Sequence, residues 1–167
     1  NFEAMKLEFI KEIVVLNEVI YGLSLLGHYL LVVTNEYLKI YDLNNNYEEV
    51  NSICINDVFL YCIDSLKIDN IYYIAMGGNS NSIFLYTINN SISTVDNEKI
   101  EELIGHKNDI NELKFLSTKK NILLSASSDS SIRIWDILKL KLLCIYGGPF
   151  GHPSHVLTID YHHSEQF

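Results

Sequence analysis

Four residues in the second half of the chain have the types and spacing that could do chemistry. They are, in order, His106, Ser125, Asp129 and Trp135. A serine, a histidine and an aspartate form the triad of serine hydrolases, in which the serine sits on a strained turn beside an oxyanion hole. Ser125 lies in an apolar segment that we predict to be a strand. The sequence therefore argues against an enzyme and predicts no catalytic residue.

The same four residues can satisfy one another inside a folded protein. The His106 imidazole can bond to Ser125 or Asp129, and the serine hydroxyl can accept a hydrogen bond from the Trp135 indole N–H. Buried polar groups are costly unless they are paired, which explains why these residue types occur together. We therefore predict a structural network rather than a catalytic site.

Histidines near the end of the sequence and three cysteines could suggest a metal centre. The histidines have no cysteine or carboxylate at a recognised ligand spacing; they are His152, His155, His162 and His163. The cysteines also lack such a spacing, and we expect them to be free thiols; they are Cys54, Cys62 and Cys144. No metal and no cofactor is predicted.

Composition limits the class of protein that presents these residues. The 167 residues are 48% hydrophobic, and 12 Lys and Arg against 21 Asp and Glu give a formal net charge of −9. Such a chain is too apolar to be disordered. Because no uninterrupted apolar stretch reaches the ~18 residues that span a bilayer, we expect no membrane association. The opening residues also lack the pattern of a signal peptide. The acidic balance disfavours direct nucleic-acid binding and suits a basic partner.

Short apolar segments separated by clusters of Asn, Asp, Gly and Ser must position the polar residues. The segments are rich in Ile, Val, Leu and Tyr, often alternate, and are four to eight residues long, as strands are. The sequence therefore predicts an all-β chain with strands at 30–33, 37–41, 71–75, 83–88, 110–115, 122–126, 132–137, 142–146 and 156–161.

Three segments end alike, in YLKIYD (37–42), SIFLYT (82–87) and SIRIWD (131–136). Tyr41 and Tyr86 are 45 residues apart, and Tyr86 and Trp135 are 49 apart. These spacings are close to the ~40 to 45 residue period of a four-stranded WD40 propeller blade. The third unit, from GH at 105–106 to WD at 135–136, resembles a WD40 repeat over its whole length, whereas the first two lack GH and WD.

A more specific resemblance covers residues 105–161. The phrases GHKNDINELKF (105–115), LLSASSDSSIRIWDI (123–137) and IYGGPFGHPSHVLTIDY (145–161) resemble the embryonic ectoderm development and extra sex combs family. This family supplies the WD40 subunit of Polycomb repressive complex 2. Weaker similarity extends upstream through IYGLSL (20–25) and DVFLYCIDSL (57–66).

The resemblance implies a non-catalytic scaffold that supports transcriptional repression in the nucleus. Proteins of this family bind a trimethylated lysine of a histone tail in an aromatic cage on one face of the propeller. They hold a helix of the histone methyltransferase catalytic subunit on the opposite side. Both the tail peptide and that subunit are therefore the expected partners, and no sequence-specific nucleic acid is expected. The alternative is a WD40 interaction scaffold of another assembly, without a cage.

The cage can be carried over only in part. Tyr21 falls on the first aromatic position of the family. Aligning Cys62 with the family's cysteine puts Leu60 on the second position and Tyr61 one place beyond it. A shift of one residue would restore Tyr61 as a cage wall, but in a regular strand it would exchange the two faces.

The resemblance also implies how the chain is divided. Residues 1–15 form an N-terminal segment that could supply a ring-closing strand, and residues 16–56, 57–104 and 105–148 form three blades. Residues 149–167 begin a fourth. A closed ring of seven blades needs about 300 residues. We therefore expect an open arc, a fragment of a ring, that is poorly soluble or oligomeric on its own because its end blades are uncovered.

Overall fold

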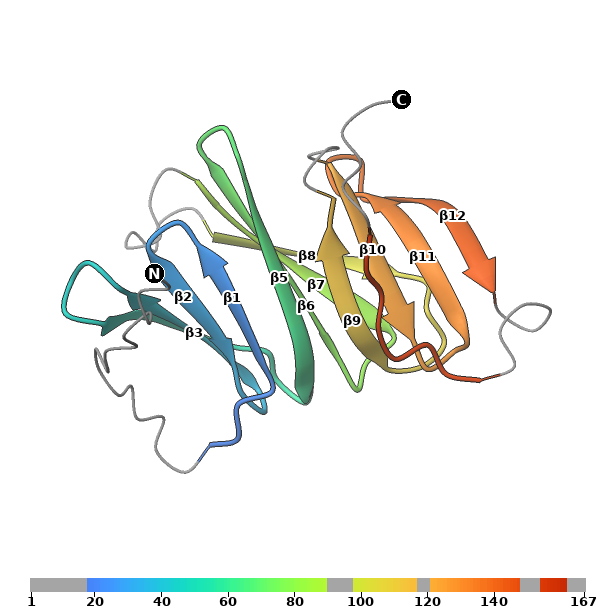
Figure 1. Ribbon diagram of the computed structural model, residues 1–167, viewed down its shortest axis with the longest axis horizontal. Helices are drawn as coiled ribbons and strands as arrows, with labels where there is room; N and C mark the ends of the chain where they lie inside the picture. The colour runs from blue at the N-terminus through green and yellow to red at the C-terminus, as the bar shows by residue number, and fades with distance from the viewer. Residues whose placement is uncertain (1–17, 90–97, 117–120, 148–153, 162–167) are drawn as a thin grey trace, which may run out of the picture.

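The computed structural model describes residues 18–89, 98–116, 121–147 and 154–161. Within them, twelve strands form three four-stranded antiparallel sheets, each taking its strands in sequence order (Figure 1). The first sheet contains β1 (Gly22–Leu26), β2 (Tyr29–Val33), β3 (Tyr37–Asp42) and β4 (Glu48–Cys54). The second contains β5 (Leu60–Ile68), β6 (Ile71–Gly78), β7 (Ser82–Asn89) and β8 (Glu98–Ile104). The third contains β9 (Ile110–Phe115), β10 (Ile122–Ser127), β11 (Ser131–Asp136) and β12 (Lys141–Gly147).

The inner strand of each sheet is its first strand. β1 lies beside β5, and β5 lies beside β9, while the later strands of each sheet fan away from this line (Figure 1). Three such sheets side by side are three blades of an open propeller. The prediction of an all-β chain that forms a partial propeller of about three blades is confirmed.

The turn that follows the third strand is built in the same way in the first and third sheets. Asp42 Oδ1 accepts hydrogen bonds from the backbone N–H groups two and three residues later, at 2.8 and 3.2 Å. Asp136 Oδ1 accepts the equivalent two bonds, both at 3.1 Å. An aspartate that bonds the backbone just after it fixes a tight turn. The aspartates of the YD and WD dipeptides therefore close their strands by the same contact.

Two apolar cores hold the sheets together. One lies between the first and second sheets and includes the fully buried Leu31, Ile40 and Ile74. The other lies between the second and third sheets and includes Ala75 and Trp135. Because the second sheet is covered on both sides, successive residues of β6 face different cores. Each buried Leu or Ile side chain contributes about 1.5–3 kcal/mol, so sheet-to-sheet packing supplies most of the cohesion.

Four strands lie outside the set that the apolar pattern predicted. β1 and β5 overlap the stretches 20–25 and 57–66 of weaker family similarity, whereas β4 and β8 lie outside those stretches too. The latter two are the outermost strands of their sheets. No residue of β4 is fully buried, and β8 has the charged sequence EKIEELI. An outer strand pairs on one side only and needs little apolar surface, so its sequence lacks the apolar pattern that predicts a strand.

The predicted strand at 156–161 is wrong. Residues 154–161 run along the third sheet without forming a strand (Figure 1). Val156 N–H donates to the Ser127 carbonyl at 3.1 Å, and the Val156 carbonyl accepts from Asn111 Nδ2 at 2.8 Å. The Ile159 N–H donates to the Glu112 carboxylate. This segment is held largely by side chains, so no ladder of backbone pairs forms.

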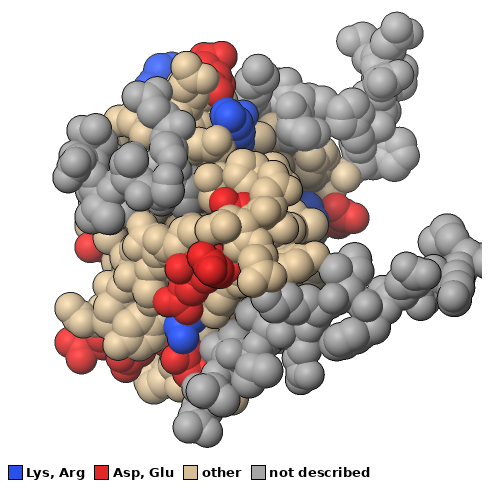
Figure 2. Space-filling view, turned by 90° about the vertical axis from the view of Figure 1, so that its left-hand side faces the viewer, with Lys and Arg blue, Asp and Glu red and all other residues tan. Residues whose placement is uncertain are grey.

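The three sheets lie within the ranges 16–56, 57–104 and 105–148. The predicted ring-closing segment at 1–15 lies outside the described residues, as do residues 148–153, which carry most of the GGPFGH phrase. Seen from the first-sheet side, the surface carries several groups of acidic side chains with uncharged areas between them (Figure 2).

Candidate functional site

The polar residues of the third sheet come from separate elements. His106 lies in the connection between β8 and β9, Ser125 in β10, Asp129 in the turn after β10, and Trp135 in β11. β10 pairs with β11 so that Leu123 is opposite Trp135. Ser125 is two residues beyond Leu123 and therefore shares its face of the sheet. The antiparallel hairpin thus brings the serine to the indole.

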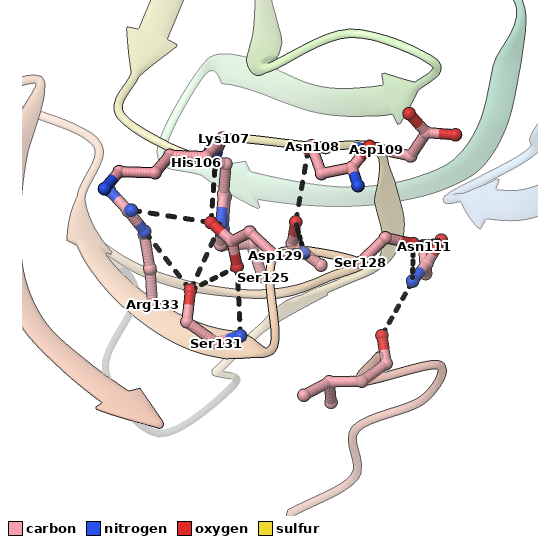
Figure 3. Close-up of polar contacts among 12 residues, drawn as sticks. His106, Lys107, Asn108, Asp109, Asn111, Ser125, Ser128, Asp129, Ser131 and Arg133 are labelled. Atoms are coloured by element: carbon pink, nitrogen blue, oxygen red, sulfur yellow. Dashed lines mark hydrogen bonds and ion pairs between the residues drawn. The ribbon is translucent and has the colours of Figure 1, made fainter. Parts of the chain in front are cut away.

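The structure brings all four side chains into one chain of hydrogen bonds. The Trp135 indole N–H donates to Ser125 Oγ at 2.9 Å. Ser125 Oγ lies 2.7 Å from His106 Nε2, and His106 Nδ1 lies 2.8 Å from Asp129 Oδ2 (Figure 3). Since Ser125 accepts from the indole, its own proton points to Nε2. The imidazole proton is then on Nδ1 and is donated to the carboxylate.

Three further residues surround Asp129, and the sequence pattern did not predict them. Ser131 Oγ–H donates to Asp129 Oδ1 at 2.5 Å, and the Lys107 backbone N–H donates to Oδ2 at 3.0 Å. The Arg133 guanidinium lies 3.5 Å from Oδ2 (Figure 3). Residues 131 and 133 alternate with Trp135 and share its face of β11. That alternation is the signal that could have found them.

This environment sets the charges of the pair. Burial lowers the pKa of His106 against the opposing effect of Asp129, so the imidazole is neutral at pH 7. Burial alone would raise the pKa of Asp129. The hydrogen bonds from Ser131, His106 and Lys107 more than offset it and lower that pKa to about 2. A neutral imidazole therefore donates to an ionised carboxylate.

Ser125 cannot act as a nucleophile in this arrangement. Its side chain is fully buried, and its hydroxyl is bonded on both sides by Trp135 and His106. A hydrolase serine must be open to its substrate. The four residues thus form a buried structural network that joins β10, β11 and the connection before β9.

A second site lies where β1 and β5 begin. Tyr21 directly precedes β1, and its backbone N–H donates to the Val33 carbonyl at 3.0 Å. The rings of Tyr21 and Tyr61 have their centroids 6.0 Å apart and are inclined at 54°. Tyr21 is 45% exposed and Tyr61 is half-buried. The structure therefore places the two predicted cage tyrosines side by side.

A cavity of about 410 Å³ opens beside the two rings. It lies between the inner strands and the segment 154–161, and all three sheets contribute to its wall. Its lining residues include Tyr21, Tyr61, Asp64, Glu112, Lys114 and Thr158. The pair of rings is thus part of the wall of a concave site, as a binding site requires.

Leu60 cannot line this cavity, although the alignment on Cys62 puts it at the cage position. Its side chain is fully buried in the core between the first and second sheets. Tyr61 occupies the cavity wall instead. The apparent conflict with strand alternation is removed by a β-bulge, since β5 pairs with β6 at Leu60 and again at Cys62 with a shift of register between them.

The cavity wall carries carboxylates, and its surroundings keep the Tyr61 phenol neutral. Burial raises the pKa of Tyr61, and the nearby Asp109 and Tyr21 raise it further. Burial also raises the pKa of Asp64, which accepts a hydrogen bond from the Phe115 N–H at 2.6 Å. A neutral phenol, and a wall on which Asp64 and Glu112 outnumber the single Lys114, favour a cationic ligand over an anionic one.

The described residues contain no group of three or more His, Cys, Asp or Glu side chains arranged to hold a metal. Within the same part of the chain, we find no helix with the length and apolar character needed to cross a bilayer.

Three strands of the third sheet and the strand before them match a known family of repeats. Residues 97–136 match the family model of the WD domain, G-beta repeat. This stretch contains β8 to β11 and the whole hydrogen-bond network from His106 to Trp135. The network therefore belongs to a WD40 repeat, and the three four-stranded sheets have the arrangement of a partial propeller of such repeats.

The particular relatives are Polycomb proteins. Over 70 residues the chain is 44% identical to the Polycomb protein esc of Drosophila virilis. The aligned stretch covers 42% of this chain and 16% of that protein. The chain is 38% identical over 69 residues to the Polycomb group protein FIE1 of rice (Oryza sativa subsp. japonica), or 41% of this chain and 15% of that protein. It is 35% identical over 80 residues to the Polycomb group protein FIE2 of Zea mays, and this stretch covers 46% of this chain and 21% of that protein.

The expected resemblance is thereby confirmed: this WD40 chain is homologous, over about 70 residues, to the Polycomb esc and FIE proteins. The chain matches about a fifth or less of the length of these relatives.

Proposed function

We propose that this chain is part of a non-catalytic WD40 scaffold that reads a methylated lysine of a histone tail. The proposed role is support of a Polycomb-type histone methyltransferase in the nucleus and thereby of transcriptional repression. The observation that carries the proposal is the pair of rings, Tyr21 and Tyr61, on the wall of a 410 Å³ cavity.

The chemistry of the pair suits a methylated ammonium. A trimethylammonium group has no N–H to donate, so hydrogen-bond acceptors cannot select it. Aromatic ring faces attract it through cation-π contacts of about 0.5–2 kcal/mol each. Asp64 and Glu112 on the same wall outnumber Lys114, so the net potential is negative and attracts a tail rich in Lys and Arg.

The partner proposal rests on the Polycomb homology and is supported by a second concave site. A groove of about 230 Å³ lies at the ends of the strands farthest from Tyr21, between the second and third sheets. Tyr73, Leu138 and Leu140 line it, and both leucines are exposed. The groove also has a polar side that includes Lys99 and Glu101. An amphipathic helix of a catalytic subunit can cover a groove with one apolar and one charged side.

Peptide binding tests the reader function. We expect the chain to bind a histone-tail peptide with a trimethylated lysine more tightly than the unmodified peptide, measured by fluorescence anisotropy. Tyr21→Ala and Tyr61→Ala should each weaken binding of the trimethylated peptide by about 2- to 30-fold, the equivalent of one cation-π contact. Binding of the unmodified peptide should barely change.

Tyr146→Ala is the matched control, because Tyr146 is exposed on β12 and lies outside the cavity. This variant should bind as the unaltered chain does. Equal affinity for the two peptides, unchanged in Tyr21→Ala, would contradict the reader function. Such a result would favour a WD40 scaffold without a cage.

A further inference from the structure

The β-bulge in β5 reverses the side-chain alternation of that strand at the position of Tyr61. From Cys62 onward, even-numbered residues such as Cys62 and Leu66 face the core between the second and third sheets. Odd-numbered residues such as Ile63 face the core between the first and second sheets. Leu60 is even-numbered, yet it lies in the same core as Ile63. The residue between Leu60 and Cys62 is therefore the extra residue of the bulge.

This reversal leaves Tyr61 in neither core. β5 pairs with β6 through Leu60 opposite Gly78 and Cys62 opposite Gly77, so Tyr61 has no partner of its own in β6. Its ring instead meets Tyr21 at 6.0 Å on the cavity wall. A bulge is a known means of redirecting one side chain at the edge of a sheet.

In the neighbouring strand β6, Gly78 leaves room for the backbone at the start of the bulge. A Cβ atom on Gly78 would lie 1.8 Å from the Phe59 carbonyl oxygen and 2.9 Å from Leu60 Cα. Both of these are backbone atoms, so they cannot move away as a flexible side chain could. Only glycine at position 78 allows the chain before Tyr61 to cross so closely.

Asn79 forms hydrogen bonds with both backbone groups of Phe59. Its backbone N–H donates to the Phe59 carbonyl at 3.0 Å, and its Oδ1 accepts from the Phe59 N–H at 2.8 Å. The next residue, Leu60, donates its N–H to the Asn35 carbonyl at 2.7 Å. The two residues before Tyr61 are thus fixed to the second sheet and to the turn between β2 and β3.

We infer that Gly78 and Asn79 are positioning residues of the aromatic site: they hold the bulge that turns Tyr61 out of the strand and against Tyr21. The expected effect of these residues on peptide affinity rests on the proposed lysine-reading function. The placement of Tyr61 itself can be tested without any ligand.

The experiment compares Asn79→Ala with Asn79→Asp. The alanine variant removes the acceptor of the Phe59 N–H, whereas the aspartate variant keeps an oxygen at that place. We expect nuclear Overhauser contacts between the Tyr21 and Tyr61 rings to weaken in Asn79→Ala and to persist in Asn79→Asp. Affinity for the trimethylated peptide should fall by about 2- to 10-fold in the alanine variant and recover in the aspartate variant.

Two further variants separate positioning from general stability. Asn45→Ala also removes one exposed side-chain hydrogen bond, from Asn45 Nδ2 to Glu48, but at a turn of the first sheet. It should leave ring contacts and affinity unchanged. Gly78→Ala should abolish the ring contacts while the indole N–H resonance of Trp135 still reports a folded third sheet.

The outcomes are distinguishable. Ring contacts that persist in Asn79→Ala would overturn the inference, whatever the peptide result. Ring contacts that are lost in Asn79→Ala and kept in Asn79→Asp would support it even if the unaltered chain failed to distinguish the two peptides, a failure that would count against the reader function alone. Loss of the Trp135 resonance in Gly78→Ala would mean that this variant does not fold, and the inference is then tested by the two Asn79 variants alone.

Discussion

His106 stays uncharged inside the fold at a pH where an exposed histidine begins to take up a proton. Its side chain is fully buried, and burial lowers its pKa against the opposing effect of Asp129. Asp129 is held in the ionised form by donors on several sides, and its pKa is about 2. Both shifts mean that acid favours the unfolded chain, because the unfolded chain binds these protons more readily.

This pair predicts a two-step loss of stability in acid. The contribution of His106 is complete above pH 6.5 and is lost as the pH falls from 6.5 toward the lower pKa of the folded state. The contribution of Asp129 is complete well above pH 3.8 and is lost as the pH falls through 3.8 toward 2. Urea unfolding at a series of pH values, followed by the fluorescence of the single tryptophan, measures both steps.

Asp129→Asn is the informative variant for this prediction. It keeps the shape of the side chain but removes the group that titrates at low pH, so the second step should become shallower. The variant should also be less stable at pH 7, by about 1–3 kcal/mol, because buried donors lose a charged acceptor. A free energy of unfolding that does not change between pH 7 and pH 5 would contradict the role of His106.

At the scale of the strand, the sequence predicts those strands and contacts that depend on apolar alternation or on residue types at a fixed spacing. The network around Ser125 follows from residue types at a known spacing, and the apolar strands follow from alternation. β4 and β8 escape prediction because outer strands can be polar. The bulge at Tyr61 escapes it because Leu60, Tyr61 and Cys62 are all apolar enough for either face, and only the close approach of Phe59 to Gly78 selects the bulged pairing.

The contact between the second and third sheets can be probed through Cys62. Its thiol is buried, its Sγ lies 3.6 Å from the Ile110 carbonyl of β9, and burial with the nearby Glu112 raises its pKa to about 12. Thiols react as thiolates, so Cys62 should resist alkylation at pH 8 until these sheets separate. Cys54 and Cys144 are partly exposed and should react first.

Peptide mapping by mass spectrometry after timed alkylation measures the three rates. Low urea that loosens the sheets should raise the rate at Cys62 before the other two rates change. Modification of Cys62 as fast as Cys144 in buffer would show that β5 and β9 are not packed as the structure has them.

At the scale of the whole molecule, the three sheets are covered unequally. The second sheet has a neighbour on each side, whereas the first and third have one neighbour each among the described residues. On the first sheet this leaves an apolar hollow lined by Leu23, Ser24, Leu25 and Leu30, in which Leu25 is 67% exposed. Exposed apolar surface of this kind favours association.

We therefore expect the 167-residue chain on its own to self-associate. Leu25→Lys should raise the monomer fraction in analytical ultracentrifugation without lowering the melting temperature, because the side chain is already exposed. Asn70→Lys adds the same charge at an exposed turn and should leave association unchanged. A monodisperse monomer at all concentrations would contradict this expectation.

The cavity beside Tyr21 has walls from all three sheets and from the segment 154–161. A ligand that fills the cavity would contact all three sheets at once, so its binding free energy would add to the cohesion of the arc. By thermodynamic linkage, a ligand at a hundred times its Kd makes unfolding costlier by about 2.7 kcal/mol. Occupancy of this cavity and packing of the three described sheets against one another are therefore one coupled equilibrium.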